Sequence, residues 1–204
     1  MFRIIRFDLL LRTIALVTVI ISISIYVLVQ TYWDPKIHLF KVITISSIVS
    51  TLLVFSLLTS FISRKIWAFF AWIDKSIYPD LNGTWEGQIT LEDGKRISAK
   101  AVIRQSLLAT QIDMHGETTK SVTLETTPTI EQGQKKLYYV YRSTPKTPGW
   151  PAYNGSTLFD IRTIRIGNEI KYELSGYYYT DRKTVGRIQL TQVSKDSNND
   201  VSFY

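Results

Sequence analysis

The fold is decided by residues 84–105, which read TWEGQITLEDGKRISAKAVIRQ. Two runs of alternating apolar and polar residues, 84–91 and 96–105, flank the segment Glu92-Asp93-Gly94-Lys95. Alternation with a period of two places successive side chains on opposite faces of a β-strand. Asp-Gly between two such runs is a strong signal for a β-hairpin. This stretch therefore predicts two antiparallel strands joined by a tight turn.

The same pattern continues along the chain and predicts an all-β domain. Strand-like runs separated by turn signals lie at 84–91, 96–105, 107–114, 119–126, 137–144, 157–166, 170–179 and 184–193. Most connections have the length of a hairpin turn, so each strand is expected to pair with its neighbours in the sequence. Eight such strands close most readily into a small antiparallel meander barrel of the lipocalin type, because closure removes exposed strand edges.

The more apolar face of each run predicts which residues fill the barrel. These faces are Trp85-Gly87-Ile89, Ile97-Ala99-Ala101-Ile103, Leu108-Thr110-Ile112-Met114, Phe159-Ile161-Thr163-Arg165, Tyr172-Leu174-Gly176-Tyr178 and Gly186-Ile188-Leu190. On the run 137–144 either Tyr138-Val140-Arg142 or Leu137-Tyr139-Tyr141 faces inward, and the pattern leaves both open. The glycines and alanines are expected to leave space. Barrels of this size are either filled with side chains or hold one small ligand.

Tyrosine and arginine in this domain indicate the chemistry of a ligand. Aromatic faces stack on flat rings, and guanidinium groups bind phosphate through paired hydrogen bonds. We therefore expect a ligand with bases and anionic phosphates. The predicted ligand-binding residues are Trp85, Tyr138, Arg142, Arg165, Tyr178 and Arg187, and the wider set of arginines also includes Arg104 and Arg182. For each residue taken alone, a structural role in a strand or on the surface is the alternative.

One predicted connection is longer than a hairpin turn. Residues 144–155 contain three prolines together with Trp150 and Tyr153. Long loops in compact domains are usually functional or disordered, and proline restricts the freedom of the backbone. The segment is either a lid at one mouth of the barrel or a packed surface loop.

The first third of the chain predicts two transmembrane helices. Uncharged apolar stretches cover residues 13–29 and 42–62. A hydrocarbon core of roughly 30 Å needs about 20 helical residues, with about 17 as the lower limit. A secretory signal peptide is the alternative for the first stretch, but the residues that follow it offer no small-residue cleavage site. We expect a domain at 1–78, with both spans and a juxtamembrane aromatic segment, and a ligand-binding barrel at 79–204.

The net charge of +7 lies mostly in the membrane-flanking region. Residues 1–78 hold eight Lys/Arg and three Asp/Glu, whereas residues 79–204 hold sixteen and fourteen. The excess of positive charge therefore indicates how the chain is oriented in the membrane, and it does not indicate that DNA or RNA is a partner. Basic residues before the first span and after the second outnumber those of the connecting loop. The positive-inside rule then places both termini and the barrel in the cytoplasm of a multi-pass membrane protein.

The sequence lacks the motifs of the common enzyme and metal-site classes. It has no cysteine and two histidines, His38 and His115, which argues against a zinc cluster. It also lacks a nucleophile elbow, a P-loop and a dinucleotide fingerprint. We expect no catalytic residue, no metal and no cofactor, and an enzyme acting on a lipid or glycan is an alternative.

The predicted spans carry small polar residues at intervals of four. The pairs are Ser46–Ser50, Ser47–Thr51, Ser56–Ser60 and Thr18–Ser22. Small residues at this spacing let helices approach closely and hydrogen-bond across the contact. The alternative is that each hydroxyl bonds back to its own helix. We expect the spans to associate with one another.

With these features combined, the chain resembles the two-transmembrane β-barrel effectors of bacterial CBASS anti-phage defence. The resemblance rests on the overall layout, on Leu81-Asn82-Gly83-Thr84-Trp85-Glu86-Gly87 and on Gly176-Tyr177-Tyr178-Tyr179. It implies that the barrel binds a cyclic dinucleotide made by a partner nucleotidyltransferase. It also implies that binding drives oligomerisation and that the helices then breach the inner membrane. Lipocalin-type barrels also begin with Gly-x-Trp, so a membrane-anchored carrier of an apolar ligand or lipid is the alternative.

Overall fold

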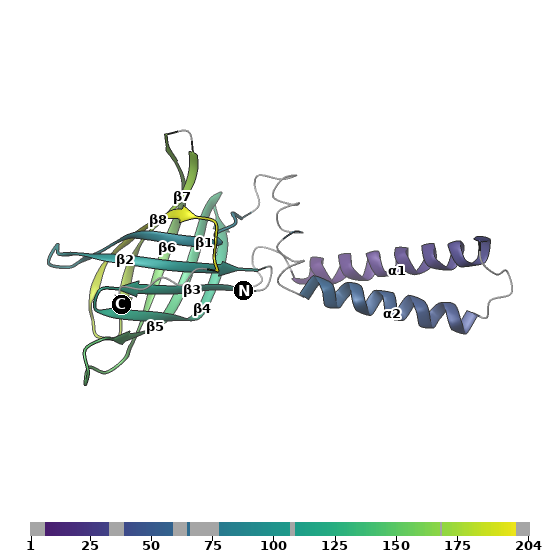
Figure 1. Ribbon diagram of the computed structural model, residues 1–204, viewed down its shortest axis with the longest axis horizontal. Coiled ribbons are helices and arrows are strands. Elements are labelled where there is room, and N and C mark those ends of the chain that lie inside the picture. Colours follow the sequence, from purple (N-terminus) through teal and green to yellow (C-terminus); the bar gives the residue numbers. More distant parts are fainter. Residues whose placement is uncertain are drawn as a thin grey trace.

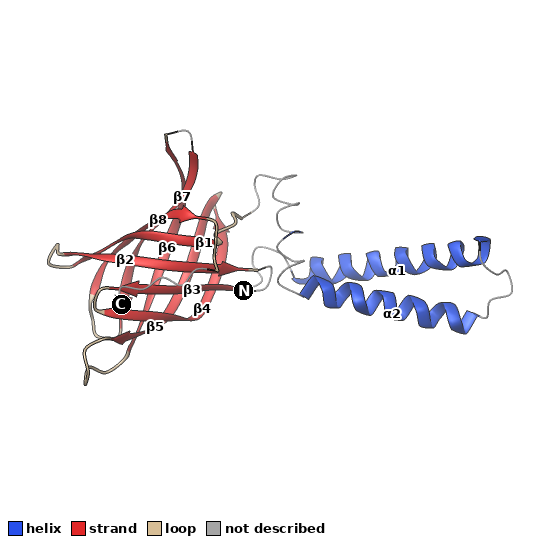
Figure 2. Ribbon diagram, in the orientation of Figure 1, coloured by secondary structure: helices blue, strands red, loops and turns tan. Residues whose placement is uncertain are grey.

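The structure is a computed structural model that describes residues 7–32, 39–58, 65, 78–106, 109–167 and 169–198. Two helices, α1 (Phe7–Tyr32) and α2 (Leu39–Leu58), come first in the chain, and eight strands follow (Figures 1 and 2). The strands are β1 (Gly83–Leu91), β2 (Arg96–Gln105), β3 (Thr110–Gly116), β4 (Thr119–Glu131), β5 (Gln134–Pro145), β6 (Tyr153–Ile166), β7 (Glu169–Thr180) and β8 (Val185–Ser194).

The eight strands form a closed antiparallel barrel in which each strand pairs with its sequence neighbours and β8 returns to β1. The predicted meander barrel is therefore confirmed. Because consecutive strands run in opposite directions, the barrel has two ends that carry different connections. We call the end where β1 begins the proximal end. The distal end carries the β1–β2, β3–β4, β5–β6 and β7–β8 connections.

Strand β5 resolves the face that the sequence left open. Leu137, Tyr139 and Tyr141 are buried inside the barrel, whereas the side chains of Tyr138 and Val140 are 39% and 38% exposed. The residue across from Tyr141 on β6 is Gly155, which leaves room for an aromatic ring on the inner face. The tyrosines of this strand are therefore divided between the interior and the outer surface.

Strands β4, β5 and β6 are each longer than predicted, and β5 extends from Gln134 to Pro145 instead of from 137 to 144. Strand β4 continues past Thr126 to Glu131, although Pro128 lacks the N–H of a regular strand residue. A register shift between Thr123 and Glu125 bends this strand. Strand β6 begins at Tyr153 rather than at 157, which shortens the predicted long loop to residues 146–152. The predicted start of the third strand, at residues 107–108, lies outside the described residues.

The glycines do not leave the space that the sequence suggested. A Cβ atom at Gly87 or Gly176 would collide with the main-chain carbonyl of Gln189 or Leu158 on the neighbouring strand. At Gly186 it would meet the ring of Tyr178. These glycines therefore permit close approach of strands and rings, which is a common role of glycine within sheets.

The proximal end is closed by the segment that leads into β1, residues 78–82, which we call the proximal plug. Tyr78 and Leu81 are fully buried in the barrel core. The Tyr78 hydroxyl donates to the carbonyl of Lys136 at 3.0 Å, and the Leu81 amide donates to Oε1 of Gln105 at 2.7 Å. The indole N–H of Trp85 donates to the Leu81 carbonyl at 3.0 Å.

Amide side chains complete the attachment of the plug. Asn82 and Gln105 exchange two hydrogen bonds, from Asn82 Nδ2 to the Gln105 carbonyl at 3.0 Å and from the Gln105 amide to Asn82 Oδ1 at 2.8 Å. Gln192 on β8 donates to the Asn82 carbonyl at 2.8 Å. Pairing on this scale satisfies polar groups that burial would otherwise penalise. The plug thus belongs to the barrel, although Tyr78 precedes the predicted domain boundary at 79.

The helices agree in part with the predicted spans. The described residues contain one helix long and apolar enough to cross a membrane, with Ala15–Tyr32 as its apolar stretch and a mean hydropathy of 2.0. Within α2 the described apolar stretch, Ile43–Leu52, is shorter. The end of the predicted second span, residues 59–62, and the aromatic segment at 66–73 lie outside the described residues.

Small polar residues connect the two helices. The Ser46 hydroxyl on α2 donates to the Ser22 hydroxyl on α1. Thr51 instead bonds back to its own helix, to the carbonyl of Ser47 at 2.8 Å. The contact between α1 and α2 is made within one chain, so association of the spans between chains stays a prediction.

Candidate ligand-binding site

Strands β1, β2 and β8 contribute apolar residues such as Ile89, Leu91 and Ile188 to the distal half of the barrel interior, whereas β3 to β7 line it mainly with hydroxyl groups and aromatic rings. On β3 to β7 the residues that face inward there are Met114, Ser121, Thr123, Tyr139, Tyr141, Ser143, Tyr153, Thr157 and Tyr178. They come from five consecutive strands, β3 to β7, because these strands present alternate residues to the same space. Among the described inward positions of this half, none carries a charged side chain. The lining is therefore neutral, with its hydroxyl groups on β3 to β7 and an apolar wall on β1, β2 and β8.

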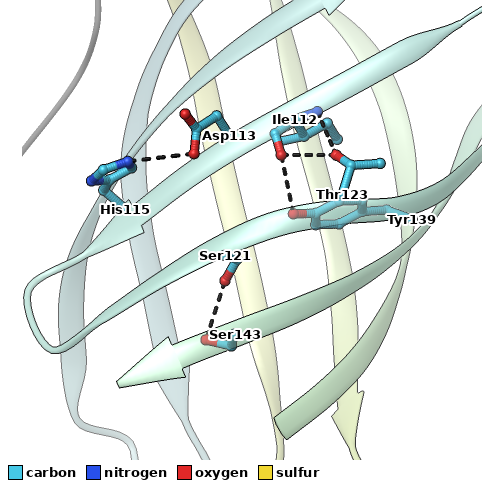
Figure 3. A network of polar contacts seen from close by, with 7 residues as sticks. All are labelled: Ile112, Asp113, His115, Ser121, Thr123, Tyr139 and Ser143. Carbon is cyan, nitrogen blue, oxygen red and sulfur yellow. Dashed lines mark hydrogen bonds and ion pairs between the residues drawn. The ribbon is translucent and has the colours of Figure 1, made fainter. Parts of the chain in front are cut away.

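Several hydroxyls of the lining are tied to the backbone or to one another (Figure 3). The Thr123 hydroxyl accepts from the Ile112 amide at 2.7 Å and donates to the Ile112 carbonyl at 2.9 Å. It thereby bridges β3 and β4, where only two residue pairs are in register. Tyr139 donates to the same carbonyl at 3.4 Å, and Ser121 donates to Ser143 at 3.3 Å.

The aromatic rings form a column along the inner wall. The rings of Tyr139 and Tyr141 stack with centroids 4.9 Å apart, and Tyr139 lies 6.2 Å from Phe159. A Cβ atom at Gly155 would collide with the ring of Tyr141. Burial raises the pKa of Tyr139 and Tyr141 well above the ordinary value for tyrosine. Both hydroxyls therefore stay neutral at physiological pH and can donate a hydrogen bond.

The hydroxyl of Thr157 differs from the other hydroxyls of the interior in its hydrogen bonding. The residue is buried on β6, and its register partners are Tyr139 on β5 and Tyr178 on β7. Its Oγ1 atom is buried without a hydrogen bond of normal geometry, although it lies near enough to the Tyr141 hydroxyl to lower the pKa of Tyr141 against the larger effect of burial. A buried hydroxyl left unpaired costs about 1–3 kcal/mol, so such groups in native proteins call for an explanation. A bound polar ligand would supply the missing partner.

The rim of the distal end is organised around Tyr153 and Arg182. The guanidinium of Arg182, in the β7–β8 turn, lies 4.3 Å from the centre of the Tyr153 ring and donates to the Pro151 carbonyl. Asp181 accepts from the Asn154 amide at 2.9 Å, and its own amide donates to the Asn154 carbonyl at 3.0 Å. The β7–β8 turn thus fastens the β5–β6 connection beside the mouth of the barrel.

The β5–β6 connection itself is held at both ends. Its first residue, Lys146, donates its amide to the Thr118 carbonyl at 2.8 Å. Between the two attachments, the Trp150 side chain is 63% exposed. This exposure rules out a tightly packed indole, and it leaves the role of a lid at the mouth as a prediction.

The histidine that the sequence analysis noted lies on the other side of the sheet. His115 on β3 alternates with the inward-facing Met114, and its Nε2 atom lies 3.4 Å from Oδ1 of Asp113 (Figure 3). Burial lowers the pKa of His115, although Asp113 acts in the opposite direction. The described residues contain no group of three or more potential metal ligands. This pair is therefore separate from the hydroxyl-lined interior.

The structure separates the six residues predicted to bind ligand. Trp85 and Tyr178 are buried inside the barrel, at the plug and at the distal end respectively. Tyr138 faces outward and donates to Glu131 at 2.9 Å, and Arg187 faces outward and donates to Ser175 at 2.9 Å. Arg142 is exposed on the outer face of β5, with Asn154 as its partner at 3.4 Å.

Arg165 occupies a different position from the other five. By the alternation of β6, Arg165 belongs to the face that points into the barrel. However, residues 161–166 of β6 pair with β7 and not with β5. The β6–β7 hairpin therefore projects beyond the adjoining strands (Figure 1), and Arg165 is exposed on it. None of the six predicted positions is thereby shown to contact ligand, and the set stays a prediction.

Sequence reasoning missed Thr157 and Tyr153 as site residues. Both belong to the inner phase of β6, and alternation counted back from Phe159 would have found them. The unpaired state of the Thr157 hydroxyl depends on partners from neighbouring strands and has no signal in the local sequence.

A closed eight-stranded meander barrel with one plugged end and one hydroxyl-lined end defines the class of small ligand-binding β-barrels. The sequence model of the family described as "Cap15, cyclic dinucleotide receptor domain" matches residues 76–192, which include the plug and nearly all of the barrel. The chain belongs to this family. This finding confirms the resemblance to CBASS effectors, and the barrel is a cyclic dinucleotide receptor domain. A search of curated proteins found no match.

Proposed function

We propose that a cyclic dinucleotide binds inside the distal end of the barrel and favours association of several chains. The helices of the associated chains then breach the bacterial inner membrane during infection. A nucleotidyltransferase encoded in the same defence system supplies the ligand. The observation that carries the ligand-binding part of this proposal is the buried, unpaired hydroxyl of Thr157, set among the rings of Tyr139 and Tyr178.

The chemistry of the distal interior suits a nucleobase. Aromatic rings such as those of Tyr139 and Tyr141 provide faces for stacking, which contributes about 1–3 kcal/mol for each base. Hydroxyls of Thr157, Ser143 and the tyrosines can both donate and accept, as the edge of a base requires. Because the plug fills the proximal end, the ligand reaches these groups from the distal end. A base therefore finds stacking and hydrogen-bonding partners at the same site.

The alternative of a carrier for an apolar ligand is less well supported. An apolar molecule in the distal interior would leave the Thr157 hydroxyl without a hydrogen bond of normal geometry and would desolvate the neighbouring hydroxyls as well. The proximal end of the interior is filled by Tyr78, Leu81 and Trp85, so an apolar ligand would have to lie beside the hydroxyl groups of the distal half. The hydroxyl groups on β3 to β7 therefore favour a ligand that forms hydrogen bonds.

In this proposal the helices are the part of the protein that damages the membrane. Helix α1 carries an apolar stretch long enough to cross a membrane, and its described side chains are mostly exposed. A ligand shifts an equilibrium only when it binds one state more tightly, so the cyclic dinucleotide must favour the associated state. Chains anchored in one plane raise each other's effective concentration, which helps association after binding. Both termini and the barrel lie in the cytoplasm, where the ligand is made.

Calorimetry on the full-length protein tests the proposal. The titrants are three cyclic dinucleotides, with two purines, with one purine and one pyrimidine, and with two pyrimidines, and each has its linear dinucleotide as a matched control. We expect saturable binding of at least one cyclic ligand and much weaker binding of its linear form, because a ring pays less entropy on being ordered. If none of the three cyclic ligands binds to folded protein, the proposed ligand class is wrong.

A further inference from the structure

The barrel has a neutral interior and a charged rim, and this division bears on how a dianionic ligand would sit. A cyclic dinucleotide combines two nearly neutral bases with two phosphates that each carry a negative charge. Within the described residues, every inward position in the distal half of the barrel is uncharged. Moving a phosphate into such an interior would remove it from water without a compensating cation, which is strongly unfavourable.

We propose that the ligand binds with a base inside the barrel and its phosphates at the distal rim, where Arg182 is the phosphate-binding residue. This assignment rests on the proposed function. It divides the roles of the site, because Thr157 and the tyrosines then recognise the base, and Arg182 recognises the backbone of the ligand.

Arg182 is singled out by its contact with the tyrosine cluster. Its guanidinium lies over the Tyr153 ring, and Tyr153 faces inward on the same side of β6 as Thr157. Tyr153 is also close enough to raise the pKa values of Tyr141 and Tyr178, after the larger effect of burial. The contacts therefore lead from the exposed guanidinium, through Tyr153, to the rings inside the barrel.

The guanidinium has capacity for a further ligand. Arginine carries five N–H donors in a fixed plane, and the contact with the Pro151 carbonyl uses one side of that fork. The contact with the Tyr153 ring, at 4.3 Å from its centre, helps to hold the guanidinium in place. A planar group fixed in this way is suited to bind two phosphate oxygens at once.

The other charges near the mouth have both signs. Burial raises the pKa of Tyr178, and Glu92 and Asp93 in the β1–β2 turn add to this effect, although Lys95 and Arg96 follow them in the sequence. After the larger effect of burial, Lys120 and Lys146 also lower the pKa of His115, which lies on the outer face of β3. The β7–β8 turn carries Asp181 beside Arg182 and Lys183, so the contact of Arg182 with Tyr153, and not the net charge of the turn, distinguishes this arginine.

Salt dependence distinguishes the two roles. The probe is whichever of the three cyclic dinucleotides binds the full-length protein most tightly, titrated by calorimetry at low and at high salt. We expect Arg182→Gln to weaken binding roughly tenfold at low salt and clearly less at high salt, because ions screen an exposed charge pair. Thr157→Val should weaken binding by the same factor at both salt concentrations. Arg162→Gln, an exposed arginine near the proximal end of β6, is the matched control and should bind as the wild type does.

The outcomes separate this assignment from the proposed function. Wild-type binding that Arg182→Gln leaves unchanged, or weakens equally at low and high salt, would overturn the placement of the phosphates at Arg182. A larger salt effect for Thr157→Val than for Arg182→Gln would overturn the inward placement of the base. Failure of the wild-type protein to bind any of the three probes would overturn the ligand class and this assignment together. Circular dichroism spectra confirm that each variant is folded.

Discussion

Replacing Trp85 by alanine is expected to lower the free energy of unfolding of the barrel by about 3–5 kcal/mol. Trp85 is fully buried in the core, and its indole N–H holds the Leu81 carbonyl of the proximal plug at 3.0 Å. The substitution removes a large packed ring and leaves a buried carbonyl without its partner. A loss of this size is a large part of the 5–15 kcal/mol by which domains are typically stable.

Chemical denaturation of the full-length protein, followed by circular dichroism, measures this effect. Trp150→Ala is the matched control, because that indole is 63% exposed and its removal should change stability by no more than about 0.5 kcal/mol. The structural reading of Trp85 would be refuted by a Trp85→Ala protein that keeps wild-type stability and loses only ligand binding. In that case the sequence prediction that Trp85 contacts the ligand would be the better account.

Removing residues 1–62 is expected to abolish killing of the host cell completely while leaving ligand binding intact. The deletion takes away both predicted spans and keeps the plug, including Tyr78, attached to the barrel. Without the apolar stretch of α1 the protein has no described segment that reaches across a bilayer. The remaining barrel can bind the ligand but has no means of damaging the membrane.

Viable counts and a membrane-potential dye report the effect in cells that also express the cognate nucleotidyltransferase. The control replaces residues 1–62 with two unrelated transmembrane helices of the same topology, which restores anchoring without the native spans. We expect this anchored chimera to be harmless as well. Killing by the free barrel or by the chimera would show that the native spans are not the effector.

The alternation of the strands made most of the barrel predictable, and the tyrosines show where that signal stops. A period of two placed Trp85, Ile103, Phe159 and Leu190 inside, as the structure has them. On β5 both faces carry tyrosine, so the alternation could not show which face is buried. Gly155, which faces Tyr141 from the next strand, leaves room for the Tyr141 ring on the inner face. This pairing can be recognised only when the register of the two strands is known.

The plug and the position of Arg165 were harder to predict for a different reason. Tyr78 and Leu81 lie before the first strand, where no periodicity marks them as core residues. The side chain of Gln105, which accepts from the Leu81 amide, and that of Gln192, which donates to the Asn82 carbonyl, hold their segment. Arg165 was assigned to the interior because alternation continues along β6 after its pairing with β5 has ended. Whether an inner-phase residue is enclosed depends on the lengths of the neighbouring strands.

The most direct test of the account compares wild type with Thr157→Val in two measurements, ligand affinity and stability without ligand. Valine has nearly the shape of threonine and lacks the hydroxyl that is buried without a hydrogen bond of normal geometry. We predict that affinity for the bound cyclic dinucleotide falls by about 1–1.5 kcal/mol, whereas the stability of the free protein is unchanged or higher. Thr157→Ser, which keeps the hydroxyl, should bind nearly as well as wild type. Unchanged affinity in Thr157→Val, or a loss of stability without ligand, would contradict the assignment of the ligand to the distal interior.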